Sequence, residues 1–228
     1  WLGRVRGEGL TLDTANKDIT YLVAMWKAVA TAKTIPLVYN TDGVRFSVED
    51  NRDSTRPPLP VEWIKTKILA SGALDGLNTD ARIILLGMIN TGYRPSEGAG
   101  ILTERVHLEG AVPFIEIAPT ETRKLKNANS KRTIPLTGIS LEAFREKPGG
   151  FTRYADSSAT LSATVNKFLR ENGLLPSAEH TMYSLRHSFE DRMLEAGIDE
   201  RIRKDLLGHT LDRERYGAVS YTHMTLPT

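Results

Sequence analysis

Residues 79–97 read TDARIILLGMINTGYRPSE, and this stretch decides the fold that we expect for the chain. Asn78 or Thr79 can cap a helix over residues 80–90. The helix is apolar around most of its surface, which is typical of a helix inside a core. Gly92 follows where a helix end favours a left-handed residue. The sequence therefore predicts a buried helix that stops abruptly before a polar turn.

Composition indicates an ordinary globular protein. The chain has 228 residues, of which 40% are hydrophobic, and its net charge is only +2. It is long enough for one large domain, or for one domain and part of another. Cysteine is absent, which excludes disulfide frameworks, thiolate nucleophiles and cysteine zinc sites, and fits a reducing cytoplasm. The apolar runs fall far short of the roughly 20 residues that a membrane span needs.

Periodicity predicts the remaining elements and an α+β fold that is mainly helical. A helix is expected over residues 12–31, capped by Asp13 or Thr14, with an apolar stripe. Pro60 can open another helix, which runs to about Ser71. Alternating residues predict three strands that form a small antiparallel sheet. The strands are expected at 106–108, 112–117 and 132–136, and further helices at 140–147, 157–172, 181–196 and 199–207.

We expect four parts along the chain. Residues 1–47 are interpreted as the remnant of a preceding helical domain, and residues 48–59, rich in proline and polar residues, as a linker. Residues 60–217 form the main domain. Residues 218–228 lack helical periodicity and have the composition of a non-native tail. We therefore expect a chain truncated at both ends.

Two polar segments contain candidate functional residues. Arg94 and Glu97 lie in the turn after the buried helix, where the alternative is a solvated turn arginine. Residues 123–132 contain five basic residues and form the expected connection between the second and third strands. A basic hairpin suits a phosphate backbone, since each cation displaces counterions; the alternative is a solvated, charged hairpin end. Its basic residues are Arg123, Lys124, Lys126, Lys131 and Arg132.

Two further segments with candidate functional residues lie near the C-terminus. Tyr183 and Arg186 are three residues apart on an amphipathic helix, so they share a face and can bind one phosphate oxygen together. His187 flanks that face, where a histidine bonded to a nearby carbonyl is the alternative. His209 follows a glycine helix stop, and Tyr216 comes seven residues later. Taken singly, each of these signals is weak.

Taken together and in this order, the four segments resemble the motifs of the tyrosine recombinase (phage-type integrase) family. The resemblance covers about residues 57–217 and is closest to the catalytic domain of a bacterial or prophage site-specific integrase. It implies a mainly helical DNA breaking-rejoining domain with a small three-stranded antiparallel sheet, preceded by the last helix of a core-binding domain. The box that often starts with histidine starts here with Tyr183. Tyr216 lies closer to His209 than is usual, and Tyr221 is the competing nucleophile.

The resemblance implies a reaction that needs no metal, cofactor or ATP. Arg94 and Arg186 would bind the non-bridging oxygens of a DNA phosphate through planar, charged forks. Tyr216 would attack the phosphorus and form a 3′-phosphotyrosyl intermediate, while Lys126 protonates the departing 5′-oxygen. We expect guanidinium groups that share one phosphate to lie less than about 15 Å apart.

The remaining roles are supporting ones. His209 would hydrogen-bond a non-bridging oxygen, His187 would act as the base, and Glu97 would orient its neighbours. The implied partners are double-stranded DNA and further copies of the chain, as a tetramer on two DNA sites in the full-length protein, with no membrane. Two alternatives stay open: strand relaxation of the type IB topoisomerase kind, and a DNA-binding module without turnover.

Overall fold

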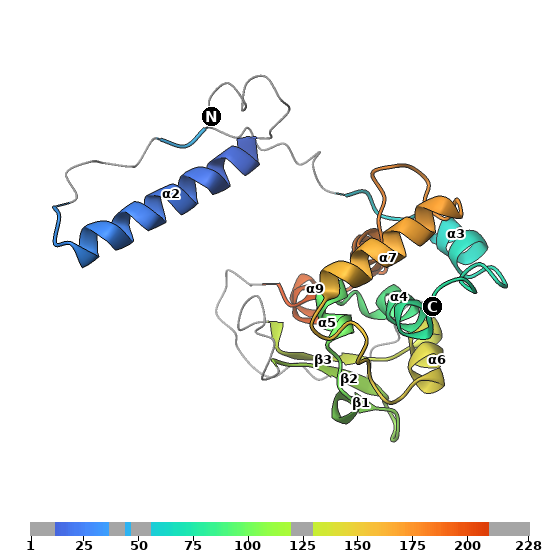
Figure 1. Cartoon of the computed structure of the whole chain (residues 1–228). Coiled ribbons are helices and arrows are strands. Elements are labelled where there is room, and N and C mark those ends of the chain that lie inside the picture. Colours follow the sequence, from blue (N-terminus) through green and yellow to red (C-terminus); the bar gives the residue numbers. More distant parts are fainter. Residues whose placement is uncertain (1–11, 37–43, 47–55, 120–129, 210–228) are drawn as a thin grey trace. The chain divides into compact units, whose positions relative to one another are not determined.

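The computed structural model describes residues 12–36, 44–46, 56–119 and 130–209 (Figure 1). The chain divides into two compact units, residues 1–55 and residues 56–228. Among the residues described, no helix combines the length and the apolarity that a membrane crossing requires. The expected tail at 218–228 lies outside the described residues.

The first unit contains helix α2, Leu12–Ala32, which confirms the helix predicted there. It begins before Asp13 and Thr14, so the prediction that one of these residues caps it is wrong. The side-chain amide of Asn16 donates to the carbonyl of Phe46 at 2.9 Å, and the Phe46 N–H donates back to the Asn16 Oδ1 at 2.9 Å. This reciprocal pair attaches a later segment of the unit to the first half of the helix.

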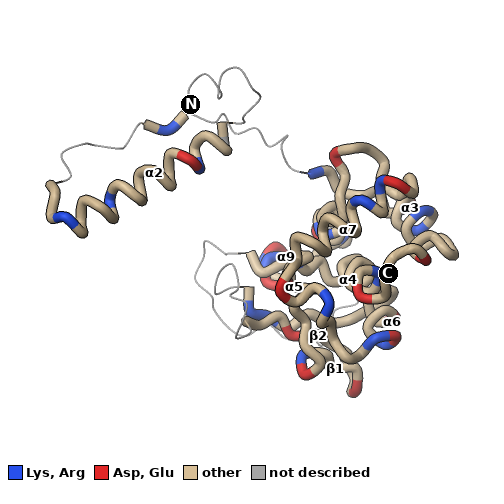
Figure 2. Tube along the Cα trace, viewed as in Figure 1, with Lys and Arg blue, Asp and Glu red and all other residues tan. Residues whose placement is uncertain are grey.

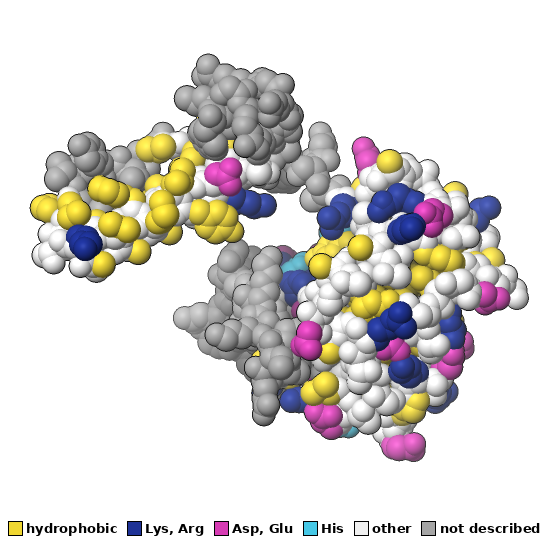
Figure 3. Space-filling model, in the orientation of Figure 1, with side chains coloured by type: hydrophobic (Ala, Val, Ile, Leu, Met, Phe, Trp, Pro, Cys, Tyr) yellow, Lys and Arg dark blue, Asp and Glu magenta, His cyan; other side chains and the backbone are white. Residues whose placement is uncertain are grey.

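The apolar stripe predicted for α2 is only partly covered. Ala15, Ile19 and Ala30 are buried, whereas Leu22 is 56% exposed and Trp26 is 40% exposed. Hydrophobic side chains are accordingly visible along this helix in the space-filling view (Figure 3).

The second unit begins with a helix that differs from the prediction. α3, Val61–Trp63, continues directly into a π-helix, η2, Ile64–Ile68, which ends before Ser71. The Leu69 N–H donates to the Ile64 carbonyl at 2.9 Å, five residues back. Ile64 and Ile68 are buried, so the wider π turn places both of these apolar side chains in the core.

Helix α4, Thr79–Thr91, forms the centre of the second unit, as predicted. Asn78 caps it, because its side-chain oxygen accepts the Ala81 N–H at 3.1 Å. Nearly every side chain of α4 is buried, and α4 contacts each of the four helices from α5 to α8. These helices and the last one are α5 Pro95–Ala99, α6 Gly138–Glu146, α7 Ser158–Glu171, α8 Ser184–Glu195 and α9 Glu200–Leu207.

The sheet is antiparallel with the order β1-β2-β3, which confirms the predicted α+β class. A short 3₁₀ helix, η3, Thr103–Arg105, leads into β1. The strands are β1 Val106–His107, β2 Phe114–Ile117 and β3 Arg132–Pro135. Ile115 pairs with Ile134 across the β2–β3 ladder, and both are fully buried. One face of the sheet therefore packs into the same core as α4.

Two glycines shape the turns that carry the candidate residues. Gly92 ends α4 with φ +59°, and a Cβ there would lie 2.5 Å from the ring of Phe189. Gly208 ends α9 with φ +66°, and a Cβ there would lie 2.8 Å from the guanidinium of Arg132. Both positions need a left-handed backbone and a missing side chain, a combination that only glycine supplies without strain.

Candidate active site

Arg94 is held by its own turn rather than solvated. It lies in an extended conformation just before α5, and Pro95 begins that helix. The Glu97 carboxylate accepts the Arg94 backbone N–H at 2.7 Å and the Arg94 Nη1 at 2.7 Å. The Arg94 side chain is 15% exposed. The alternative of a free surface arginine is therefore excluded, and the guanidinium is fixed at the edge of the core.

Glu97 joins two arginines. Its second partner is Arg132, whose Nη1 and Nη2 donate to the two carboxylate oxygens at 3.1 and 2.8 Å. The Glu97 side chain is only 4% exposed. Burial alone would raise the pKa of this carboxyl, but the hydrogen bonds and charge of Arg132, together with those of Arg94, lower the pKa to about 2. Glu97 is therefore ionised at neutral pH and holds both guanidinium groups.

Arg132 has a position that sequence reasoning missed. Besides Glu97, its fork binds the Leu206 carbonyl at 2.7 Å and the Ser130 carbonyl at 2.8 Å, and its side chain is 6% exposed. The geometry favours an internal, positioning role over the phosphate contact that we expected for Arg132. A signal was present, because side chains two apart on a strand share a face, and Arg132 precedes the buried Ile134 by two.

Arg186 is almost completely enclosed, at 1% exposure. Its Nη1 donates to the Gly92 carbonyl at 2.6 Å and its Nη2 to the Leu207 carbonyl at 2.6 Å. Burial and the nearby charge of Arg94 lower its pKa to about 10, while Tyr183 opposes that shift. The group stays charged at neutral pH. Leu185 and Phe189 lie in the core on one face of α8, and Ser184 and Ser188 are buried beside Arg186.

The guanidinium groups of Arg94 and Arg186 converge. The Arg94 Nη2 approaches the Gly208 carbonyl at 3.5 Å, while Arg186 binds the carbonyl of the preceding residue, Leu207. Adjacent Cα atoms are about 3.8 Å apart. The two forks thus meet at one turn, well within the separation of about 15 Å beyond which no single phosphate would join them.

His209 stands at the same turn. Its Nε2 lies 2.9 Å from the Arg186 Nη2. Arginine only donates hydrogen bonds, so Nε2 accepts and Nδ1 carries the ring hydrogen. Burial, followed by the charges of Arg186 and Arg94, lowers the pKa of His209 to about 4. The imidazole is therefore neutral at physiological pH and adds no charge to the cluster.

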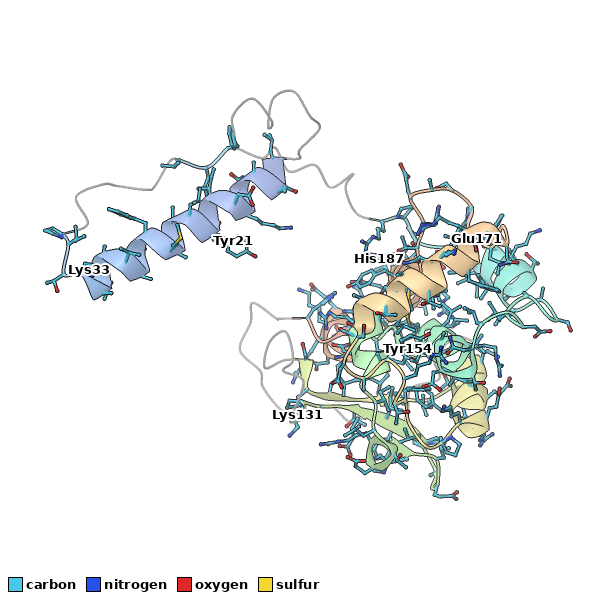
Figure 4. The ribbon with its side chains drawn as sticks, in the orientation of Figure 1. Tyr21, Lys33, Lys131, Tyr154, Glu171 and His187 are labelled. Carbon is cyan, nitrogen blue, oxygen red and sulfur yellow. The ribbon has the colours of Figure 1, made fainter. Side chains whose placement is uncertain are left out.

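Tyr183 and His187 lie beside the arginines and contact each other. Their ring centroids are 5.3 Å apart, and the Arg56 guanidinium lies 5.6 Å from the Tyr183 ring. His187 is half-buried, and burial lowers its pKa. His187 lies in the first turn of α8 and is labelled in Figure 4. A neutral imidazole in this position is able to accept a proton.

Of the remaining candidate site residues, Lys131 is described and the others lie outside the described residues. Lys131 is exposed just before β3 (Figure 4). The described residues contain no group of three or more histidine, aspartate, glutamate or cysteine side chains arranged to hold a metal ion. The candidates outside the described residues are Arg123, Lys124, Lys126, Tyr216 and Tyr221.

The cluster has an excess of positive charge. Arg94 and Arg132 bind the Glu97 carboxylate, Arg186 binds at the same turn and the imidazole of His209 is neutral, so these five side chains together carry a charge of +2. Elsewhere in the second unit, acidic and basic residues are interspersed (Figure 2). Arginine forks near the same point match the paired oxygens of a phosphate. The arrangement is therefore suited to binding a phosphodiester anion.

Comparison with known proteins agrees with this chemistry. The model of the family described as the phage integrase family matches residues 67–225. The tyrosine recombinase XerA of Pyrococcus furiosus is 30% identical over 139 residues, which are 56% of this chain and 46% of that protein. XerC of Pelobacter propionicus is 26% identical over 163 residues, 64% of this chain and 48% of its own length. The chain thus spans about half the length of the curated relatives that it matches.

Solved structures share the fold. The Tn1549 transposon integrase in complex with transposon right end DNA superposes with a TM-score of 0.63 at 17% identity, covering 91% of this chain and 75% of that one. The XerH site-specific recombinase bound to its difH substrate, in a pre-cleavage complex, gives a TM-score of 0.60 at 20% identity, covering 91% and 62%.

Proposed function

Because the chain belongs to the phage integrase family, we propose that it cleaves and rejoins DNA at specific sites through a 3′-phosphotyrosyl intermediate. Its tyrosine recombinase relatives belong to a family of DNA-cleaving and DNA-rejoining enzymes. The observation that carries the proposal is the convergence of Arg94 and Arg186 on one turn, with a local charge of +2.

The two arginines stabilise the transition state. Attack on a phosphodiester concentrates negative charge on the non-bridging oxygens, and Arg94 and Arg186 present fixed forks to that charge. The carbonyl bonds of Arg186 and the carboxylate bonds of Arg94 hold the forks before DNA arrives. Little reorganisation is then required during the reaction. His209, which is neutral, supplies a hydrogen bond to a non-bridging oxygen without adding charge.

The covalent step transfers the phosphoryl group from DNA to the protein. The Tyr216 phenolic oxygen forms a bond to phosphorus as the bond to the 5′-oxygen breaks. The phenolic proton passes to a base, for which we propose His187, and Lys126 gives a proton to the departing 5′-oxygen. A phenol with an ordinary pKa near 10 needs this help at neutral pH. Tyr183, beside Arg186, completes the face that binds the phosphate.

Strand exchange follows from the reversibility of this step. The phosphotyrosine preserves the energy of the broken bond, so a 5′-hydroxyl of another strand is able to attack it and restore a phosphodiester without ATP. The basic segment with Arg123, Lys124 and Lys131 is proposed to contact the DNA backbone. In a full-length protein we propose a tetramer on two DNA sites, acting in the cytoplasm.

A nicked-duplex assay tests the function. The chain is incubated with a pool of duplexes that are randomised around a nick, and covalent protein–DNA adducts are separated on a denaturing gel. The proposal predicts an adduct that is lost in Tyr216→Phe and retained in Tyr221→Phe. The reverse pattern moves the nucleophile to Tyr221. Absence of any adduct from the unaltered chain contradicts cleavage by this chain, and relaxation of a plasmid without a specific site favours the topoisomerase alternative.

A further inference from the structure

We propose that Arg132 is a positioning residue for the cleavage step, acting on Arg94 through Glu97; this inference rests on the proposed function. Sequence reasoning placed Arg132 among the residues that bind the DNA backbone. Its bonds in the structure point instead into the protein, to three segments that carry other parts of the site.

Hydrogen-bond capacity argues against a DNA contact. A guanidinium has five N–H groups. Arg132 directs four of them into the protein: Nε to Leu206, Nη1 to Ser130 and Glu97, and Nη2 to Glu97. With one N–H left, the fork of Arg132 cannot present the paired N–H groups that a phosphate binds, whereas Arg186 engages three of its five. The charge of Arg132 is already directed at the Glu97 carboxylate.

Glu97 transmits the position of Arg132 to Arg94. Its two oxygens accept four hydrogen bonds, two from Arg132 and two from Arg94. A carboxylate has about four acceptor sites, so the group is saturated and its plane is fixed by both partners. Without Arg132, the carboxylate is held only by the two bonds from Arg94, and both of these come from its own turn. The Arg94 guanidinium would then lose its fixed orientation.

Arg132 also connects the other segments of the site. It is the first residue of β3 and the last of the basic residues at 123–132. Its Nε bond to the Leu206 carbonyl reaches the last turn of α9. Gly208 leaves room for the guanidinium, because a Cβ at Gly208 would lie 2.8 Å from the Arg132 Nη1. His209 follows immediately. One side chain thus joins the arginine turn, the histidine turn and Ser130.

The arrangement requires a guanidinium. The acceptors lie on three segments, and only a planar fork reaches them together. Lysine keeps the charge but offers donors from a single nitrogen, so it would keep the ion pair to Glu97 and lose the other anchors. Arg132→Lys therefore tests the planar fork while the positive charge is kept. Arg105→Lys is the matched control, since Arg105 also binds a carboxylate, that of Glu116, at 2.9 Å.

The test measures single-turnover cleavage of the nicked duplex at saturating protein, together with DNA affinity over a range of salt concentrations. A misplacement of about 1 Å typically costs about 100-fold in rate, so Arg132→Lys is expected to slow cleavage about 100-fold. Its DNA affinity and salt slope should match those of the unaltered chain. Arg105→Lys should retain the full rate. A salt slope reduced by about 1 in Arg132→Lys would instead identify a phosphate contact and overturn the inference.

A double-mutant cycle separates positioning from a general structural role. If Arg132 acts through Arg94, then Arg94→Ala combined with Arg132→Lys is no slower than Arg94→Ala alone. An additional loss of about 100-fold in the combined variant contradicts the inference. Glu97→Asp shortens the carboxylate that joins Arg132 to Arg94. This variant replaces Arg132→Lys in the test if Arg132→Lys does not fold. It should show the same loss and the same non-additivity.

A spectroscopic readout keeps this inference distinct from the proposed function. The Nε–Hε NMR signal of Arg94, assigned by its loss in Arg94→Lys, should shift in Arg132→Lys and stay unchanged in Arg105→Lys. If the unaltered chain forms no adduct, the proposed function fails, and this signal alone decides the positioning role. An Arg94 signal that is unchanged in Arg132→Lys overturns it.

Discussion

Replacing Glu97 with glutamine is expected to lower the free energy of unfolding by about 3–5 kcal/mol at pH 7, because it leaves two buried arginines facing a neutral group. The carboxylate accepts four N–H groups at 2.7–3.1 Å, and its side chain is 4% exposed. Hydrogen bonds to a charged group contribute about 1.5–3 kcal/mol each. The glutamine amide keeps one acceptor oxygen, so only part of the summed free energy of the four hydrogen bonds is lost.

The pKa of Glu97 gives an independent magnitude. It is about 2 in the folded protein, whereas an unfolded glutamate titrates near 4.3. A difference of about two units corresponds to about 3 kcal/mol, since each unit is worth about 1.4 kcal/mol. The folded pKa is the lower one, so this stabilisation is present above about pH 4.3 and is lost as the pH falls toward 2.

Urea unfolding followed by tryptophan fluorescence between pH 7 and pH 3 checks both values. The gap between the unaltered chain and Glu97→Gln should be constant down to about pH 5 and about half as large near pH 3. Glu116→Gln is the control, because Glu116 binds Arg105 but is 34% exposed, and its loss should stay below about 1 kcal/mol. A Glu97→Gln cost below about 1 kcal/mol, or a gap independent of pH, refutes the reasoning.

Three other outcomes are expected. Arg186→Lys should lose about 2–4 kcal/mol of transition-state stabilisation in the adduct assay, because an ammonium cannot present a fork; an unchanged adduct rate contradicts this. Gly92→Ala should destabilise the fold by about 2–4 kcal/mol through its positive φ and its clash with Phe189, whereas Gly149→Ala, which meets nothing within 4 Å, should leave thermal unfolding nearly unchanged. His209 should titrate near pH 4 by NMR, so that its contribution to stability is present above about pH 6.5 and lost as the pH falls through 4; a midpoint near 6.5 is incompatible with the buried, arginine-bonded ring.

The candidate site was only partly predictable, and the reason differs between residues. Arg94 and Glu97 are three residues apart, so their pairing depends on one local turn and is visible in the sequence. Arg132 and Leu206 are 74 residues apart, and Arg186 and Gly92 are 94 apart. No local pattern encodes such bonds. The sequence therefore suggested that Arg186 shares a polar face with Tyr183, but its burial at 1% exposure depends on three packed segments.

Local signals in the sequence are enough to predict the apolar helix α4 with its Asn78 cap, the alternating strands and the glycine helix stops. Hydrophobic period and capping chemistry act within a few residues, so they survive without tertiary context. The tertiary structure alone decided the π turn of η2 and the inward direction of Arg132. Both arise where distant segments compete for space and hydrogen bonds, and that competition exists only once the core has closed.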